Sequence, residues 1–222
     1  MITILCPTYD RPAQCKRMVE SAIATADNPV EIILGISGEQ PDRVYTDYEA
    51  AGFPKSVWFT MAGPYPTAHV LNMLAEKAKG NLLMIVGDDC VFATPSWDTA
   101  LIKAYNALDD KLHLFSLRDS RDMNGTPHPV VTKELKEALG YLAPPIFLHF
   151  AVDTWLVDIA KATGKFTHLM DYLLVHDKPS DRGKADHTHN RIRAMGYNER
   201  DMAVYKTCER YKQFDIERVK NA

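Results

Sequence analysis

Short apolar segments alternate with segments of helical spacing through the first half of the chain. The pattern predicts strands over residues 2–6, 31–37 and 56–61, a fourth strand that starts at Leu82, and helices over residues 14–26, 41–51 and 67–79. Parallel strands need crossover connections long enough for a helix, so repeated units of this kind imply a mostly parallel central sheet with helices on both faces. We therefore expect an α/β fold.

The second half follows a looser pattern. It predicts helices over residues 96–108, 132–139 and 152–163, strands over residues 112–117 and 169–176, a polar loop over residues 177–190 and helices to the end. Thr67 and Ser96 are expected to cap the helices that they precede. No repeat or linker interrupts the sequence, so we expect a single domain over residues 1–222.

The composition suits one large core. Of the 222 residues, 46% are hydrophobic, which is ample for a folded domain of this size. The four cysteines have no CxxC spacing, which argues against a disulfide framework and favours a reducing compartment. The chain opens without a basic, signal-like segment and has no run of about 20 apolar residues. We expect a cytoplasmic protein that does not enter a membrane.

Charge is distributed unevenly along the chain. Residues 1–177 carry 15 Lys and Arg against 22 Asp and Glu, whereas residues 178–222 carry 11 against 7. A basic tail can meet phosphate groups or nucleic acid. The signs alternate within the tail, as in Glu199-Arg200-Asp201, and an ordinary solvated helix has the same pattern. Both interpretations stay open.

Two adjacent carboxylates follow the fourth strand. The apolar residues 82–86 lead through Gly87 to Asp88 and Asp89. Ligands gather at the carboxyl ends of strands in an open parallel sheet, and Asp oxygens bind the hard divalent cations that accompany phosphates. The sequence therefore predicts a metal and diphosphate site here. The alternative is an acidic, solvated turn.

Three segments resemble the GT-A nucleotide-sugar glycosyltransferases, in particular those of family 2. They are Ile-Leu-Cys-Pro-Thr-Tyr-Asp-Arg-Pro at residues 4–12, residues 71–80 leading into Val-Gly-Asp-Asp at 86–89, and Asp-Thr-Trp at 153–155 followed by His176. The resemblance implies a Rossmann-like GT-A fold and transfer of a sugar from a nucleotide diphosphate to an acceptor hydroxyl. It further implies a nucleotide-sugar-binding half over residues 1–110, an acceptor and catalytic half over 111–177, and a loop with a helical tail over 178–222.

The resemblance places the donor at the end of the first strand, on Pro7, Thr8, Tyr9 and Arg11. Tyr9 offers a face for stacking, and Arg11 offers a planar fork of donors for phosphate oxygens. The alternative is a β-turn with an exposed Arg. Arg182 and Lys184, in the polar loop, could close over the diphosphate as parts of a lid. The alternative is a flexible surface loop without a role in binding.

The acidic motif departs from the family pattern. Gly87 stands at its first acidic position, which leaves Asp89 as the expected metal ligand and Asp88 near the ribose or the waters of the metal. Whether the metal is strictly required stays open. The resemblance adds His176 as a second ligand, and carboxylate with imidazole suits Mn²⁺ at least as well as Mg²⁺. A strand-end His that bonds only to its neighbours is the alternative.

Inverting transfer needs a base that takes the proton of the acceptor hydroxyl. By resemblance this base is Asp153, although Val152 replaces the usual first acid of the pair. Asp153 could instead be a helix N-cap. Trp155 could form an acceptor platform or simply be buried.

The sequence also raises three rival functions. Asp186, His187 and His189 with His176 could bind zinc, but no HExxH or paired-Cys spacing supports zinc hydrolysis. A nucleotidyltransferase would need a Gly-rich phosphate loop after the first strand, and this loop is missing. A non-catalytic nucleotide- or sugar-binding module would explain why Gly87 and Val152 stand where acids are expected.

The acceptor stays open between saccharide, protein hydroxyls and modified nucleic acid, the last being a substrate of some phage enzymes.

Overall fold

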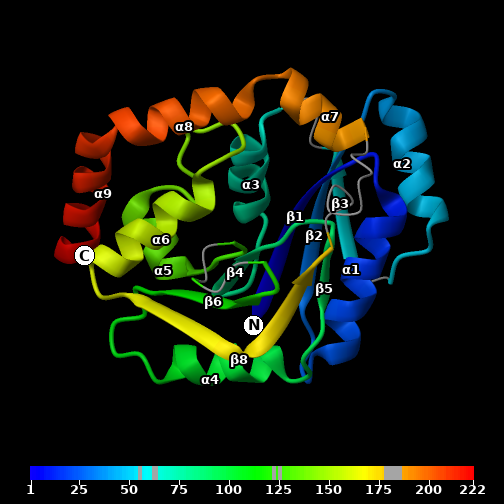
Figure 1. Ribbon diagram of the computed structural model, residues 1–222. Coiled ribbons are helices and arrows are strands. Elements are labelled where there is room, and N and C mark those ends of the chain that lie inside the picture. Colours follow the sequence, from blue (N-terminus) through cyan, green and yellow to red (C-terminus); the bar gives the residue numbers. More distant parts are fainter. Residues whose placement is uncertain (55–56, 62–64, 122–123, 125–126, 178–186) are drawn as a thin grey trace.

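A single sheet organises the protein. The computed structural model describes residues 1–54, 57–61, 65–121, 124, 127–177 and 187–222. Within these residues the sheet has eight strands in the order β3-β2-β1-β4-β7-β6-β8-β5 (Figure 1). The strands are β1 (Ile2–Tyr9), β2 (Glu31–Ser37), β3 (Val57–Met61), β4 (Leu82–Ile85), β5 (Cys90–Phe92), β6 (Leu114–Asp119), β7 (Val130–Thr132) and β8 (Phe166–His176).

The sheet has a parallel half and a mixed half. The pairs β1–β2, β2–β3, β1–β4 and β6–β8 are parallel. The two three-residue strands run against their neighbours, because β7 pairs antiparallel with β4 and β6, and β5 pairs antiparallel with β8. The predicted α/β fold with a mostly parallel sheet is confirmed.

Helices cover both faces of this sheet. They are α1 (Pro12–Thr25), α2 (Pro41–Ala50), α3 (Thr67–Ala75), α4 (Trp97–Asn106), α5 (Lys133–Leu139), α6 (Val152–Ala162), α7 (His187–Ala194), α8 (Tyr197–Thr207) and α9 (Glu209–Asn221). One core cluster joins the sheet to α1, α2 and α4, and the other joins it to α3, α5, α6 and α9. Figure 1 shows α1 and α2 on one side and α3, α6 and α9 on the other.

The central strand β1 explains the two-sided core. Ile4 and Cys6 belong to the first cluster and Leu5 to the second, and all three side chains are fully buried. Side chains alternate between the faces of a strand, so a continuous apolar run is what a strand covered on both faces requires.

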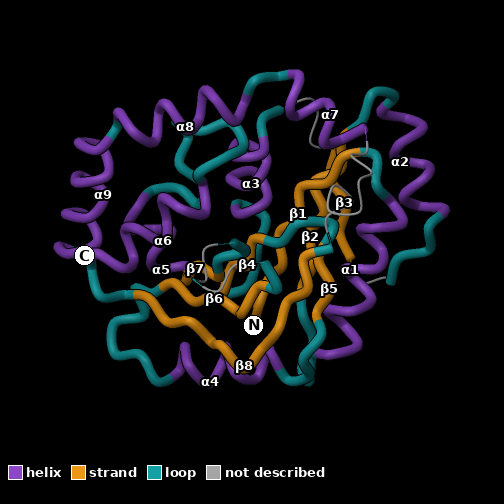
Figure 2. The backbone as a smooth tube through the Cα atoms, in the orientation of Figure 1, coloured by secondary structure: helices purple, strands orange, loops and turns teal. Residues whose placement is uncertain are grey.

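A bend in β8 brings its end back to the sheet. Its register with β6 shifts between Leu117 and Arg118, whose partners on β8 are Leu169 and Leu173. The skipped residues form the bend that Figure 2 shows in β8. Beyond it His176 becomes the register partner of Cys90 in β5. The end of β8 therefore reaches the residues that follow Asp88 and Asp89.

Several predicted boundaries differ from the structure. Residues 187–190, which were predicted as the end of a polar loop, form the start of α7. Helix α3 ends at Ala75, whereas the sequence predicted residue 79. The N-cap of α3 is Pro66, not Thr67. Ser96 is the N-cap of α4 as predicted, but its backbone is left-handed and its side chain forms no capping hydrogen bond. The hydroxyl of Thr67 instead contacts His149 Nδ1 at 2.6 Å.

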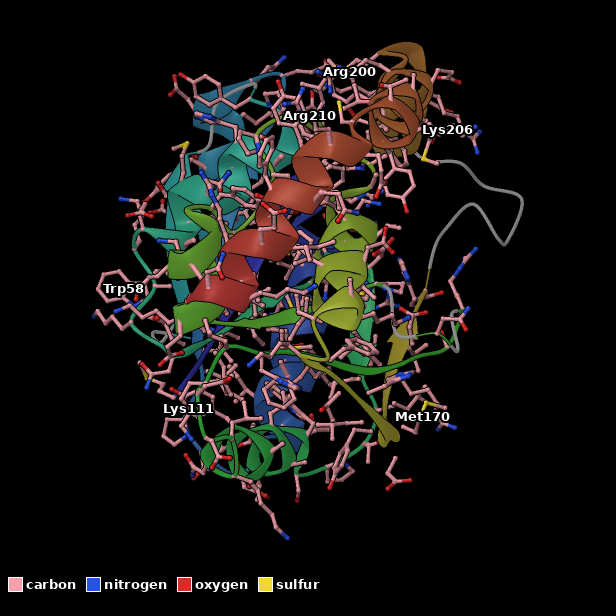
Figure 3. All side chains as sticks on the ribbon, turned by 90° about the vertical axis from the view of Figure 1, so that its left-hand side faces the viewer. Trp58, Lys111, Met170, Arg200, Lys206 and Arg210 are labelled. Carbon is pink, nitrogen blue, oxygen red and sulfur yellow. The ribbon has the colours of Figure 1, made fainter. Side chains whose placement is uncertain are left out.

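The C-terminal helices pack onto the second core cluster. Ile216 and Val219 of α9 are buried there, and Figure 3 shows α9 beside α6. Trp155 Nε1 donates to Asp215 at 3.1 Å, and Lys212 Nζ pairs with Asp158 at 2.7 Å. The basic residues Arg200, Lys206 and Arg210 are exposed on the outer side of α8 and α9 (Figure 3). None of the helices that the structure describes is long and apolar enough to cross a bilayer.

One buried carboxylate of α8 holds the segment that precedes α6. Asp201 is fully buried and accepts hydrogen bonds from the backbone N–H groups of Leu148 (3.1 Å), His149 (2.7 Å) and Phe150 (2.8 Å). The side chain of Arg200 pairs with the same carboxylate at 2.7 Å. Burial raises the pKa of Asp201, but these donors outweigh it and hold the pKa below its usual value.

Asp201→Asn is expected to lower the free energy of unfolding by about 1.5–3 kcal/mol, the range for hydrogen bonds to a charged group. Because the folded-state pKa is depressed, the stabilisation is present above the unfolded pKa and is lost as the pH falls through the folded value. Urea denaturation at pH 7 and at pH 3 measures both effects. The matched control is Asp171→Asn, which changes an exposed carboxylate of β8; equal losses in both variants at pH 7 would contradict the expectation.

Candidate active site

A cavity of about 930 Å³ lies at the carboxyl ends of β1 and β4. All the predicted site residues that the structure describes line it: Pro7, Thr8, Tyr9, Arg11, Asp88, Asp89, Asp153 and His176. They come from the end of β1, the turn after β4, the start of α6 and the end of β8. The fold therefore brings together four segments that are far apart in the sequence.

Asp88 and Arg11 pair with each other at the floor of the cavity. Arg11 Nη1 lies 2.9 Å from Asp88 Oδ1, and Thr8 Oγ1 donates to Asp88 Oδ2 at 2.7 Å. Both charged residues are buried. Burial raises the pKa of Asp88 against the opposing attraction of Arg11. The structure thus pairs Arg11 with a carboxylate of the protein and rules out the alternative of an exposed Arg in a turn; the predicted contact of Arg11 with phosphate stays a prediction.

Asp89 and His176 lie next to each other in the wall of the cavity. Asp89 Oδ1 lies 3.4 Å from His176 Nε2. Burial is the largest influence on the Asp89 pKa and raises it, but the hydrogen bond and charge attraction to His176, helped by His128 and Arg11, bring the pKa down to about 2. Asp89 is therefore ionised at neutral pH, with one oxygen directed at an imidazole nitrogen.

The glycine in the acidic motif has a steric explanation. A Cβ atom at Gly87 would lie 2.8 Å from Asp89 Oδ1, 3.6 Å from His128 Cε1 and 3.8 Å from Cys90 Sγ. A side chain at this position would push the Asp89 carboxylate away from its place. The departure from the family pattern thus leaves room for the groups around Asp89.

The other ring nitrogen of His176 belongs to a cluster that the sequence did not reveal. His176 Nδ1 lies 3.2 Å from Asp119 Oδ2 and 3.4 Å from His128 Nε2, and His128 Nε2 lies 3.2 Å from Cys90 Sγ. Burial raises the pKa of Asp119, but His128 and His176 hold it far below its usual value. Burial, with Asp89 and Asp119 nearby, raises the pKa of the Cys90 thiol well above its usual value.

Asp153 lies in the first turn of α6. The N-cap is Ala151, with a left-handed φ of 62°, so Asp153 is not the cap that the sequence left as an alternative. Its Oδ1 accepts a hydrogen bond from Thr154 N at 2.7 Å. Burial raises the pKa of Asp153 above its usual value, and hydrogen bonds from Thr154 and attraction to His128 oppose this only in part. The carboxylate therefore binds protons more readily than an ordinary Asp.

Helix α7 covers the end of β1. Thr188 Oγ1 donates to the backbone carbonyl of Tyr9 at 3.0 Å, and the Arg191 guanidinium lies 4.2 Å from the centre of the Tyr9 ring. Arg121, Arg191 and Arg193 add positive charge to the lining of the cavity. The sequence did not single out these residues, because the helix that carries two of them starts inside a segment as polar as a loop.

The predicted lid residues Arg182 and Lys184 lie outside the described residues, as does Asp186 of the alternative zinc site. The side chains of His187 and His189 are also outside the described part, although their backbone belongs to α7. The predicted roles of all five residues stay predictions.

No protein-family model matches the chain. A segment of 102 residues is 26% identical to the O-antigen biosynthesis protein RfbC of Myxococcus xanthus, and it amounts to 46% of this chain and 8% of that protein. The chain thus spans a small fraction of the length of this relative.

Solved structures match over more of the chain. The mannosyltransferase PcManGT from Pyrobaculum calidifontis, in complex with GDP-Man and Mn²⁺, superposes with a TM-score of 0.62 at 19% identity, over 91% of this chain and 63% of that one. Glucosyl-3-phosphoglycerate synthase from Mycobacterium tuberculosis, in complex with Mn²⁺, UDP and glucosyl-3-phosphoglycerate, gives a TM-score of 0.56 at 15% identity, over 82% of this chain and 74% of that one. The chain therefore has the GT-A fold of these glycosyltransferases.

Proposed function

We propose that this chain is a glycosyltransferase that moves a sugar from a nucleotide-diphosphate donor to an acceptor hydroxyl with the help of a divalent cation. The observation that carries the proposal is that Asp89, His176 and Asp153 line the same cavity at the carboxyl ends of β1 and β4. The shared fold with structures solved with GDP-Man or UDP and Mn²⁺ supports it.

Asp89 and His176 are the residues that we propose to hold the cation. Asp89 Oδ1 and His176 Nε2 face each other at 3.4 Å. When Nδ1 of His176 carries the ring proton, both atoms are electron-pair donors, and a positive charge between them relieves their repulsion. This pair suits Mn²⁺ or Mg²⁺. Such a cation supplies charge stabilisation for the departing nucleoside diphosphate.

We propose Asp153 as the general base of an inverting transfer. A base works best when its pKa approaches the working pH, and burial moves the pKa of Asp153 in that direction. Its place in the first turn of α6 leaves the carboxylate on the cavity wall. There it can take the proton of an acceptor hydroxyl as the oxygen attacks the sugar.

The donor is proposed to lie along the end of β1. Pro7, Thr8 and Tyr9 would contact the base and ribose, with Asp88 close by. Positive charge for the diphosphate would come from Arg11, Arg121, Arg191 and Arg193 of the cavity lining. Arg182 and Lys184 stay proposed lid residues.

For the acceptor we propose a saccharide or modified nucleic acid. DNA binding that weakens as the salt concentration rises would favour modified nucleic acid, because protein contacts with phosphate release counterions.

Hydrolysis of the donor tests the proposal. We expect slow release of nucleoside diphosphate from one of the UDP, GDP, CDP or dTDP sugars in the presence of Mn²⁺, and at least about 100-fold less release in Asp89→Asn, because metal assistance provides several kcal/mol. Asp171→Asn, an exposed carboxylate of β8, is the matched control. Nucleotide binding in a thermal-shift assay without any turnover would favour a non-catalytic binding module instead.

Asp153→Asn is expected to lower kcat by about 10²–10⁴-fold, the usual contribution of a general base. The wild-type rate should fall on the acid side as Asp153 becomes protonated. Because its pKa is raised, that fall should be centred above the ordinary Asp value of about 3.9. A pH profile of transfer measures this, and a rate that stays constant down to pH 4 would contradict the assignment.

A further inference from the structure

Four side chains form a compact cluster beside the proposed donor site, which we call the thiol–imidazole cluster: Cys90, Asp119, His128 and His176. Cys90, Asp119 and His128 have no role in the function proposed above. Cys90 and Asp119 are buried, and the side chains of His128 and His176 are 11% and 9% exposed.

His128 Nε2 lies at the centre of the cluster. It is 3.2 Å from Cys90 Sγ, 3.4 Å from His176 Nδ1 and 3.4 Å from Asp119 Oδ2. A ring nitrogen carries at most one proton and donates it along one direction. Sulfur, nitrogen and oxygen atoms with lone pairs thus surround this one ring nitrogen, and a cation between the sulfur and the ring nitrogens can be shared by them.

The spacing of these atoms suits a zinc ion. Zinc binds imidazole nitrogen at about 2.0–2.1 Å and thiolate sulfur at about 2.3 Å in tetrahedral sites, which puts neighbouring ligand atoms about 3.3–3.6 Å apart. The contacts of His128 Nε2 with Cys90 Sγ and with His176 Nδ1, at 3.2 and 3.4 Å, are close to these values. The ligand atoms of Cys90, His128 and His176 all lie within 4.8 Å of one another.

The backbone brings the four side chains of the thiol–imidazole cluster together. Cys90 and His176 are register partners in β5 and β8, and Asp119 is the last residue of β6. His128 has a left-handed φ of 56°, which is costly for a residue other than glycine. The cluster is thus assembled from three strand ends and one strained loop residue.

We propose that Cys90, His128 and His176 bind a thiophilic divalent cation, Zn²⁺, next to the Asp119 carboxylate, whose negative charge favours a cation there. On binding, a zinc–sulfur bond forms and the thiol proton passes to solvent. The donor set of one thiolate and two imidazoles is soft enough to favour zinc over Mg²⁺ or Mn²⁺.

His176 connects this site to the proposed donor site. It offers Nδ1 to the thiol–imidazole cluster and Nε2 to Asp89. A neutral imidazole has one free nitrogen and can hold only one of the two cations. In the zinc-bound state its Nε2–H donates to Asp89, an arrangement common for metal-bound histidines. This competition rests on the proposed function; the zinc site itself does not.

Titration of the metal-free protein with Co²⁺, a spectroscopic probe for zinc sites, tests the proposal. We expect a thiolate-to-cobalt charge-transfer band in the near ultraviolet that saturates at one equivalent and disappears on addition of Zn²⁺. The band should be absent in Cys90→Ser and unchanged in Cys208→Ser, a matched variant of a free cysteine between α8 and α9. His128→Asn should weaken or abolish it without changing the thiol.

A wild-type protein without the band, or a band that survives in Cys90→Ser, would overturn the zinc site. Should Cys90→Ser fail to fold by circular dichroism, His128→Asn decides: an unchanged band there counts against the site. Asp89→Asn separates the two proposals, because it should keep the cobalt band while it loses Mn²⁺-dependent release of nucleoside diphosphate. Failure of the proposed function would thus leave the cobalt result intact.

Discussion

The buried pair of Arg11 and Asp88 is the interaction on which the rest of the site depends. It joins the segment after β1 to the turn after β4, and Thr8 and Tyr48 extend it with hydroxyl contacts of 2.6–2.7 Å. An ion pair of this kind is no strong source of stability, because both charges lose their hydration. It does fix the direction of the turn, so that the next residue, Asp89, points into the cavity.

The other side of the cavity depends on the path of β8. Without the register shift opposite Leu117 and Arg118, the strand would continue along β6, and His176 would not reach its place opposite Cys90. The residues of the thiol–imidazole cluster therefore come from the start of β5, the ends of β6 and the bent strand β8, and the loop before β7.

Much of the fold was predictable from sequence, and the reason is physical. Strands such as β1 and β2 are buried on both faces and therefore have long apolar runs, whereas β5 and β7, with three residues each, are too short to show any pattern. Site residues at strand ends, such as Asp89 and His176, were found because an apolar run marks the strand before them. His128, in an irregular loop, and Arg191, in a polar helix, have no such marker. The partner of Arg11 was also beyond the sequence, since a guanidinium suits a phosphate and a carboxylate equally well.

The carboxylate of Asp201 ties the last part of the chain to the cavity wall. Its acceptor oxygens organise the backbone at residues 148–150, and His149 and Phe150 line the cavity. Helix α8 is thereby linked to the peptide groups that precede the proposed base, so a partner that displaced α8 would strain them as well. Chimeras that exchange the C-terminal helices would have to keep this one acidic position in register, whatever else they replaced.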